Sequence, residues 1–265
     1  MSTRLPVRKT YKLFVGGAFP RSESGRTLEV EGYNVARASR KDAREAVVAA
    51  RKAVAGWSGA TAYNRGQVLY RLAETMETRA SALAVAAGGR REVARAIDRV
   101  VWYAGWADKL AQVLGSSNPV AGPYFNFTLP EPTGVVALVA PDEPALDGLV
   151  ARLAPAIVGG NAVVAVASET HPLAAIELAE AVATSDVPPG VVNVLTGFRA
   201  ELAPVLAGHM DVNAIDVTGA DGEAAALEAL AAENVKRVVR AKEDQSPWEI
   251  ASFMELKTVW HPIGR

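Results

Sequence analysis

Apolar positions in the first half of the chain follow the period of an amphipathic helix. Between residues 43 and 57 they recur every three or four positions and form one stripe. Ser39 and Asp42 precede this stripe with a spacing close to that of a capping box, so the sequence predicts a helix that begins just after Ser39. The same spacing predicts helical structure over 64–85 and 92–114.

In the second half, short runs of β-branched residues alternate with alanine-rich helical stretches. Strands that alternate with helices indicate a parallel, doubly wound sheet with right-handed crossovers. The sequence therefore predicts an α/β fold, a Rossmann-like sheet with helices on both faces. The five predicted strands are 135–140, 162–167, 191–195, 213–217 and 235–239.

Two further segments favour β-structure outside this alternation. Over residues 12–30, two apolar runs flank the turn-rich stretch 20–25, which predicts a hairpin. Residues 124–129, YFNFTL, form a run of aromatic and β-prone residues. The prolines on either side of this run suit an exposed edge strand or an arm.

Composition excludes several classes of function. The 265 residues are 50% hydrophobic and carry a net charge of −1, with both signs mixed along the chain. This balance gives no footprint for nucleic acid, so we expect small-molecule or protein partners. No apolar run approaches the roughly 20 residues of a membrane span, and no secretory signal is recognised. We expect no membrane association and a cytoplasmic protein.

The segment 159–197 carries a family resemblance. Its sequence, GGNAVVAVASETHPLAAIELAEAVATSDVPPGVVNVLTG, matches the patterns G-N-[TA]-V-V-x-K-P-S-E-x-T-P and L-P-P-G-V-x-N-V-x-T-G. These patterns are typical of the cofactor-binding core of the aldehyde dehydrogenase superfamily, which the chain resembles over nearly its whole length. It departs at Val166 and Ala167, where the family has lysine and proline.

The resemblance implies a candidate NAD(P) site. Ser168 and Glu169 would lie near the adenosine ribose, and Thr218 and Gly219 belong to a loop that approaches the phosphates. The lysine replaced by Val166 would add a charge-assisted hydrogen bond, and its loss weakens binding by about tenfold to a hundredfold.

A serine that would contact a phosphate is likewise replaced, by Ala220. We therefore expect no physiological cofactor, with weak or vestigial NAD(P) binding in an inherited cleft as the alternative. For Glu169 taken alone, a solvated acid at a helix start is the favoured interpretation.

The catalytic groups that the family uses are all replaced. The chain has no cysteine to act as the nucleophile. Glu143 stands where an asparagine would hold the oxyanion, and Ala241 aligns with the glutamate base. His171, His209 and His261 are too dispersed for a metal site. We predict no catalytic residues, no metal and no enzymatic activity, as in a pseudoenzyme.

The resemblance also implies a domain organisation. Segments 1–115 and 133–247 would form the NAD(P)-binding-type domain, and segments 116–132 and 248–265 an oligomerisation arm made of a β-hairpin and the C-terminal strand. The family's catalytic domain is expected to be missing, so the chain resembles the degenerate, non-catalytic second half of two-part members.

An arm of this kind needs another surface, because an isolated β-ribbon is marginally stable in water. In family oligomers that surface includes a neighbouring catalytic domain. The leading hypothesis is a non-catalytic subunit that joins a full-length aldehyde dehydrogenase in a hetero-oligomer, in a structural or regulatory role. Two alternatives remain, a homodimer and a self-associating NAD(P)-binding module or sensor.

Overall fold

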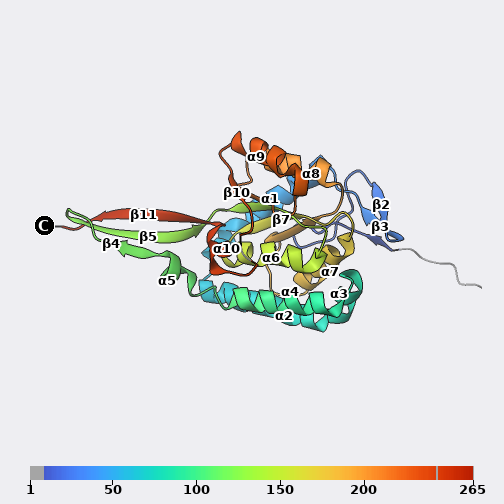
Figure 1. The fold of residues 1–265 in the computed structure, drawn as a ribbon, viewed down its shortest axis with the longest axis horizontal. Coiled ribbons are helices and arrows are strands. Elements are labelled where there is room, and N and C mark those ends of the chain that lie inside the picture. Colours follow the sequence, from blue (N-terminus) through green and yellow to red (C-terminus); the bar gives the residue numbers. More distant parts are fainter. Residues whose placement is uncertain (1–8, 243, 265) are drawn as a thin grey trace, which may run out of the picture.

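A five-stranded parallel sheet forms the centre of the molecule (Figure 1). The computed structural model describes residues 9–242 and 244–264. The strand order is β10-β9-β6-β7-β8, and every neighbouring pair is parallel, as predicted. The strands are β6 (Val135–Val139), β7 (Ala162–Val166), β8 (Val192–Leu195), β9 (Ala214–Asp216) and β10 (Arg237–Val239).

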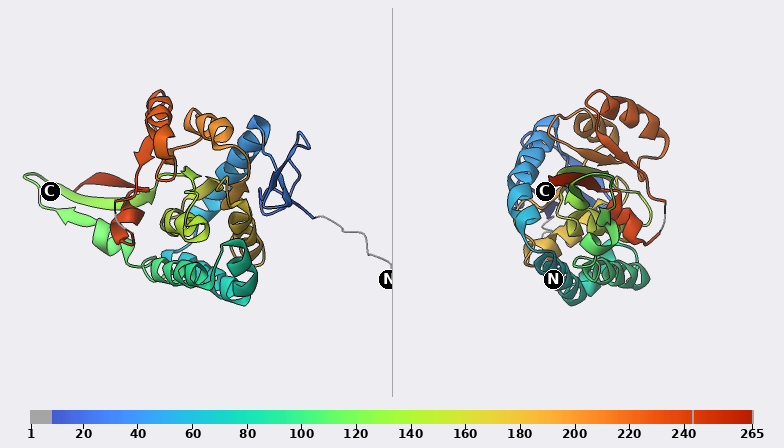
Figure 2. Two further views of the ribbon diagram at one scale, coloured as in Figure 1. Left: turned by 45° about the vertical axis from the view of Figure 1, so that its right-hand side comes forward. Right: turned by 90° about the vertical axis from the view of Figure 1, so that its left-hand side faces the viewer.

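Helices cover both faces of this sheet, as the two views of Figure 2 show. The helices α6 and α7 pack on one face, with α2 and α4 outside them, and α1, α8 and α9 pack on the other. The helices are α1 (Arg40–Gly59), α2 (Ala62–Thr78), α3 (Ala80–Ala86), α4 (Arg90–Ala104), α5 (Leu110–Leu114), α6 (Ala145–Val158), α7 (Pro172–Ala183), α8 (Arg199–Ala207), α9 (Ala224–Ala232) and α10 (Pro247–Ala251).

The central strand β6 contributes to two separate cores. All five of its side chains are buried, which explains its continuous apolar run. Because side chains alternate along a strand, Val136 and Leu138 join the core beneath α6 and α7, whereas Val135, Ala137 and Val139 join the core beneath α1 and α8. Among the described residues, no helix is both long and apolar enough to cross a membrane.

The predicted start of α1 is confirmed. The Ser39 hydroxyl accepts from the N–H of Asp42, and the Asp42 carboxylate accepts from the N–H of Ser39 at 2.7 Å, so the capping box is complete. Asp42 also accepts a hydrogen bond from Ser22 at 2.8 Å. The same carboxylate thus caps the helix and ties it to the N-terminal segment.

The N-terminal hairpin lies later in the chain than the sequence predicts. Its strands are β2 (Thr27–Val30) and β3 (Tyr33–Ala36), joined through Glu31 and Gly32. The earlier apolar run, predicted to be the first strand, instead crosses to the main sheet, where Phe14 exchanges backbone hydrogen bonds with Val194. Strand β1 (Thr10–Tyr11) lies parallel to β3.

A three-stranded antiparallel ribbon stands out from the body (Figures 1 and 2). It consists of β4 (Ser116–Asn118), β5 (Tyr124–Pro132) and β11 (Met254–Pro262), with β5 in the middle. β5 and β11 pair over nine residues, from Met254 opposite Pro132 to Pro262 opposite Tyr124. Its strands β5 and β11 include the aromatic run 124–129 and the C-terminal strand of the predicted arm.

The short connection from β10 to β11 is anchored in the body. Helix α10 packs on α6, and Ile250 is fully buried, so this helix belongs to the body rather than to the ribbon. Arg152 of α6 forms ion pairs at 2.6 Å with Asp216 of β9 and Glu249 of α10. All three side chains are at most 4% exposed, so this cluster fixes the connection against the sheet.

Candidate functional site

The carboxyl edge of the sheet is where this topology offers a ligand site. From β6 the chain proceeds outward to β7 and β8, then crosses back to β9 and β10 on the other side. Crevices at such a switch point, beyond the carboxyl ends of the strands, are the usual ligand sites of parallel α/β sheets. All four predicted cofactor residues lie at this edge, in the loops after β7 and β9.

Ser168 and Glu169 follow β7, and both bond to other parts of the chain. The buried Ser168 hydroxyl donates to the Asp142 carboxylate at 2.9 Å and accepts from the N–H of His171 at 2.9 Å. The Glu169 carboxylate accepts from the backbone N–H of Arg199, the first residue of α8. Each side chain thus has an intramolecular partner where the family resemblance implies a ribose.

Thr218 and Gly219 follow β9 and are also engaged. The Thr218 hydroxyl accepts from the N–H of Ala241 at 2.8 Å, and its own N–H donates to Asp216 at 2.8 Å. Gly219 packs directly on the loop after β6, where a β-carbon would collide with the backbone of Pro141. Glycine is therefore required here for the approach of two loops.

Arg199 joins the two sides of the switch point and was missed by the sequence analysis. Its side chain is 8% exposed. One terminal nitrogen, Nη2, lies 3.2 Å from both the Asp142 carboxylate and the Ala140 carbonyl, and Nη1 lies 3.6 Å from the Asp221 carboxylate. Its position at the start of a helix that follows a strand was the available signal, because such positions border the crevice.

Carboxylates dominate the electrostatics of this crevice. Burial raises the pKa of Asp142, but hydrogen bonds from Ser168 and the Glu169 N–H, together with the Arg199 guanidinium, outweigh it and hold this pKa below its usual value. Asp142 is thus ionised, and Asp221 lies on the opposite side of Arg199. The residues present do not fit the pyrophosphate of a dinucleotide, because the carboxylates of Asp142 and Asp221 outnumber the Arg199 guanidinium between them.

The predicted replacements of catalytic groups lie at the same edge. Glu143 follows β6 with its side chain 83% exposed, and its carboxylate lies 3.6 Å from the Nε2 of His171. The Nδ1 of His171 lies 2.9 Å from the Glu31 carboxylate. The side chain of Ala241 is only a methyl group. Its backbone N–H donates to the Thr218 hydroxyl. Within 9–242 and 244–264, no group of three or more histidines and acids could hold a metal ion.

Of two pockets in the molecule, one lies beside the carboxyl edge of the sheet and the other lies away from it. One, of about 690 Å³, lies beside the loops after β6 and β7 and is lined by three carboxylates, those of Glu31, Glu92 and Glu143, and by Arg95 and His171 among others. Its acidic lining disfavours anionic ligands.

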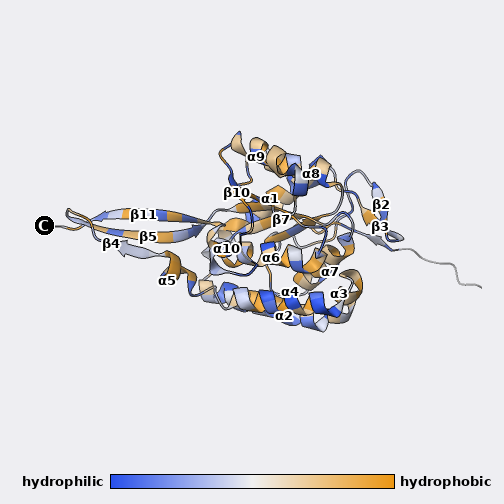
Figure 3. Ribbon diagram, in the orientation of Figure 1, coloured by the Kyte–Doolittle hydropathy of each residue, from blue (hydrophilic) through white to orange (hydrophobic). Residues whose placement is uncertain are grey.

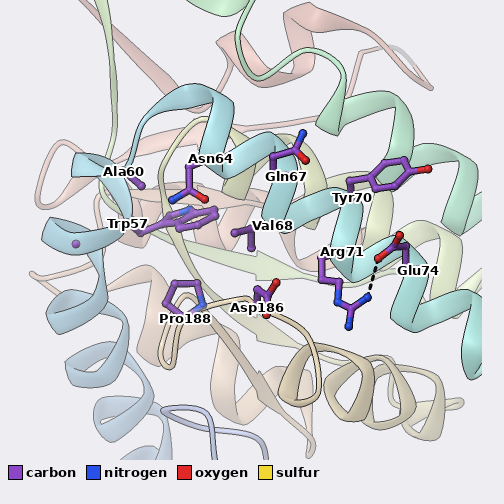
Figure 4. A pocket seen from close by; sticks show the side chains of 11 residues that line it. Trp57, Ala60, Asn64, Gln67, Val68, Tyr70, Arg71, Glu74, Asp186 and Pro188 are labelled. Atoms are coloured by element: carbon purple, nitrogen blue, oxygen red, sulfur yellow. Dashed lines mark hydrogen bonds and ion pairs between the residues drawn. The ribbon is translucent and has the colours of Figure 1, made fainter.

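The second pocket, of about 760 Å³, lies between α1, α2 and the loop before β8 (Figure 4). Trp57 forms part of its wall and donates through Nε1 to the Ile157 carbonyl at 2.8 Å, and the ion pair of Arg71 with Glu74 lies on the α2 side. Pro188 precedes β8, which places this pocket towards the amino ends of the strands. It is therefore separate from the predicted site.

Comparisons with known proteins agree with this architecture. The model of the aldehyde dehydrogenase family matches residues 27–261. "Aldehyde dehydrogenase, cytosolic 1" of Elephantulus edwardii is 32% identical over 257 residues, which cover 89% of this chain and 50% of that protein.

Solved structures give the same result. The crystal structure of HpcC from Thermus thermophilus superposes with a TM-score of 0.83 and 31% identity, covering 88% of this chain and 48% of that one. The structure of the NAD+ complex of aldehyde dehydrogenase from Bacillus cereus gives a TM-score of 0.79 and 25% identity, covering 87% and 50%.

The chain therefore belongs to the aldehyde dehydrogenase family. It spans about half the length of the curated relatives that it matches. The family match runs into β11, so the body and most of the ribbon are parts that this chain shares with its relatives.

Proposed function

We propose that this chain is a non-catalytic aldehyde dehydrogenase-like subunit that assembles with a full-length aldehyde dehydrogenase through its ribbon. The observation that carries the proposal is the ribbon itself, which presents apolar side chains on both faces and has no core of its own. A structural or regulatory role follows, because the partner would supply the chemistry.

The first face of the ribbon carries Tyr124, Leu256 and Trp260. The pairing register places these residues on one side, and Tyr124 and Trp260 meet edge to face with their ring centroids 5.8 Å apart. Tyr124 is 42% exposed, Leu256 57% and Trp260 58%. Aromatic residues presented in this way are typical of the centres of protein interfaces.

The opposite face carries Phe125, Phe127 and Leu129. The two phenylalanine rings lie tilted to each other with centroids 5.3 Å apart, while Phe125 and Leu129 remain about half exposed. Figure 3 shows hydrophobic segments between hydrophilic ones along β5 and β11, away from the body. A ribbon that is apolar on both faces needs contact on both to be fully buried.

The outer edges of the ribbon add backbone groups to this surface. Among the described residues, β4 and β11 each pair only with β5, so each has one edge without a strand partner. Such edges serve as templates for strand addition from a second chain. The family resemblance implies that a neighbouring catalytic domain supplies such a surface, and this favours a full-length relative as partner.

The absence of a nucleophile supports the non-catalytic part of the proposal. The 265 residues contain no cysteine, and the positions aligned with the base and the oxyanion donor are Ala241 and Glu143. An anion at Glu143 repels the developing oxyanion that the family mechanism has to stabilise. The chain between β10 and β11 is only the 14-residue connection 240–253.

Co-purification tests the proposal. The tagged chain is co-expressed with an untagged full-length aldehyde dehydrogenase from the same organism, and the eluate is weighed by native mass spectrometry. We expect a mixed oligomer, and a matched Leu256→Ser/Trp260→Ser variant that keeps the fold but loses the partner. Recovery of the tagged chain alone, as monomer or homodimer, would count against the hetero-complex, and a stable homodimer would support the self-associating alternative.

A further inference from the structure

Arg199 is a buried cation placed across the crevice where parallel α/β sheets bind their ligands. We infer that Arg199 is an internal plug: it locks the switch-point crevice shut and makes the fold independent of a dinucleotide. This inference does not rest on the proposed assembly, since it concerns the opposite end of the strands from the ribbon's attachment.

The anchors of the plug come from both sides of the switch point. The Ala140 carbonyl and the Asp142 carboxylate belong to the loop after β6, each 3.2 Å from Nη2. The Asp221 carboxylate, 3.6 Å from Nη1, belongs to the segment after β9. A single side chain therefore holds together two loops that a ligand in the crevice would have to separate.

Two further contacts close the same crevice independently of the guanidinium. The first N–H of α8, at a helix end that would otherwise attract an anion, is taken by the Glu169 carboxylate. Gly219 lies against Pro141 too closely for any side chain between them. The loops after β6, β7 and β9 and the start of α8 thus form one bonded unit.

The charges around Arg199 distinguish an internal plug from a phosphate-binding site. Arg199 faces two carboxylates, Asp142 and Asp221, and its backbone N–H bonds to a third, Glu169. An incoming pyrophosphate would have to displace these acids from the guanidinium and then remain beside them. Like charges at such short range, in a partly desolvated crevice, oppose that exchange.

Thermal unfolding with and without dinucleotide tests the inference. The wild type, Arg199→Ala and Arg199→Lys are compared with Arg37→Ala, a control that removes a more exposed guanidinium paired with Glu201 of the same helix. We expect Arg199→Ala to lower Tm by about 5 °C or more below the control, because it leaves Asp142 partly buried without its cation. Arg199→Lys keeps the charge without the planar fork, so its Tm should lie between those of the wild type and Arg199→Ala.

The wild type should show no shift of Tm with NAD+ or NADP+ at about 5 mM, a concentration that detects sites of micromolar affinity by mass action. A rise of Tm with either dinucleotide, or an Arg199→Ala variant as stable as the Arg37→Ala control, would overturn the inference. Should Arg199→Ala fail to fold, the dinucleotide titration of the wild type and the Arg199→Lys variant decide the matter. A hetero-complex formed by a chain that also binds NAD+ would refute the plug and leave the proposed assembly intact.

Discussion

The carboxyl edge of the sheet and the ribbon differ in whether their side chains are engaged within the chain or exposed to solvent. At the carboxyl edge, Ser168, Glu169 and Thr218 all bond to other parts of the same chain, and Arg199 joins the loops. On the ribbon, β4 and β11 each have one edge without a strand partner among the described residues, and residues such as Trp260 are more than half exposed.

This contrast concerns two kinds of surface. A ligand site keeps polar groups available for a molecule from outside, and an interface keeps apolar groups available for another chain. In this molecule the first kind of surface is internally satisfied and the second kind is retained. This contrast supports the proposal that the chain contacts a protein rather than a small molecule.

The largest expected effect concerns the buried cluster that holds the connection to the ribbon. Arg152→Ala removes the guanidinium from the buried carboxylates of Asp216 and Glu249 and should lower the free energy of unfolding by about 3–5 kcal/mol. Urea unfolding measures this loss in the free energy of unfolding. Arg240→Ala removes an exposed pair with Glu228 and should cost about 0.5 kcal/mol or less. Equal losses in the two variants would show that the body does not depend on this cluster.

On the ribbon the expected effect is on association rather than on folding. Trp260→Lys should weaken binding to the partner by about 30-fold or more, equivalent to about 2 kcal/mol, because an exposed aromatic anchor is replaced by a charge. The free energy of unfolding of the isolated chain should change by about 0.5 kcal/mol or less. A large loss of stability with unchanged association would mean that Trp260 serves the fold of its own chain.

At the carboxyl edge, Asp142→Asn removes an ionised acceptor. The side chain is 34% exposed, so solvent screening limits the expected loss at pH 7 to about 1–2 kcal/mol. The folded-state pKa of Asp142 lies below the ordinary value of 3.8, so its contribution is complete above that value and is lost as the pH falls through the folded pKa.

Urea midpoints at pH 7 and below pH 4 measure this dependence. The wild type should lose more stability on acidification than Asp142→Asn, in which this group no longer titrates. Identical losses in the two proteins would show that Asp142 contributes nothing to the acid sensitivity of the edge.

The smallest effect is expected at Thr218. Its hydroxyl accepts from the Ala241 N–H, so Thr218→Val should cost about 1 kcal/mol while Thr218→Ser, which keeps the hydroxyl, should cost less. Urea unfolding of both variants gives the comparison. A Thr218→Val variant as stable as the wild type would show that the fold does not need the hydroxyl of Thr218. This result would weaken the contrast between the two regions.

Much of the fold follows from the sequence because apolar periodicity reports burial directly. The five sheet strands and the capped start of α1 are confirmed to within a few residues. The motif asparagines explain why the family pattern persists: Asn161 and Asn193 are fully buried and bond to backbone groups of distant segments, including Phe253 and Gly16. These motif residues serve the fold whether or not a cofactor binds.

The candidate site could be predicted only in part, because its bonds link residues distant in the sequence. Ser168, Glu169, Thr218 and Gly219 lie at the expected edge, but the sequence does not reveal that their groups are already bonded. Arg199 reads as a surface residue at the start of a short helix. The hairpin was misplaced for a similar reason, since pairing of the first apolar run with β8 is not a local property.

Hydrogen–deuterium exchange tests the contrast between the two regions most directly, measured on the chain alone and on the co-expressed complex. We predict that amides at 168–170 and 216–219 are protected in both states. Outward-facing amides of β11 should exchange rapidly in the isolated chain and become protected in the complex. Rapid exchange at the carboxyl edge that slows with NAD+, combined with a ribbon already protected in the isolated chain, would contradict this contrast.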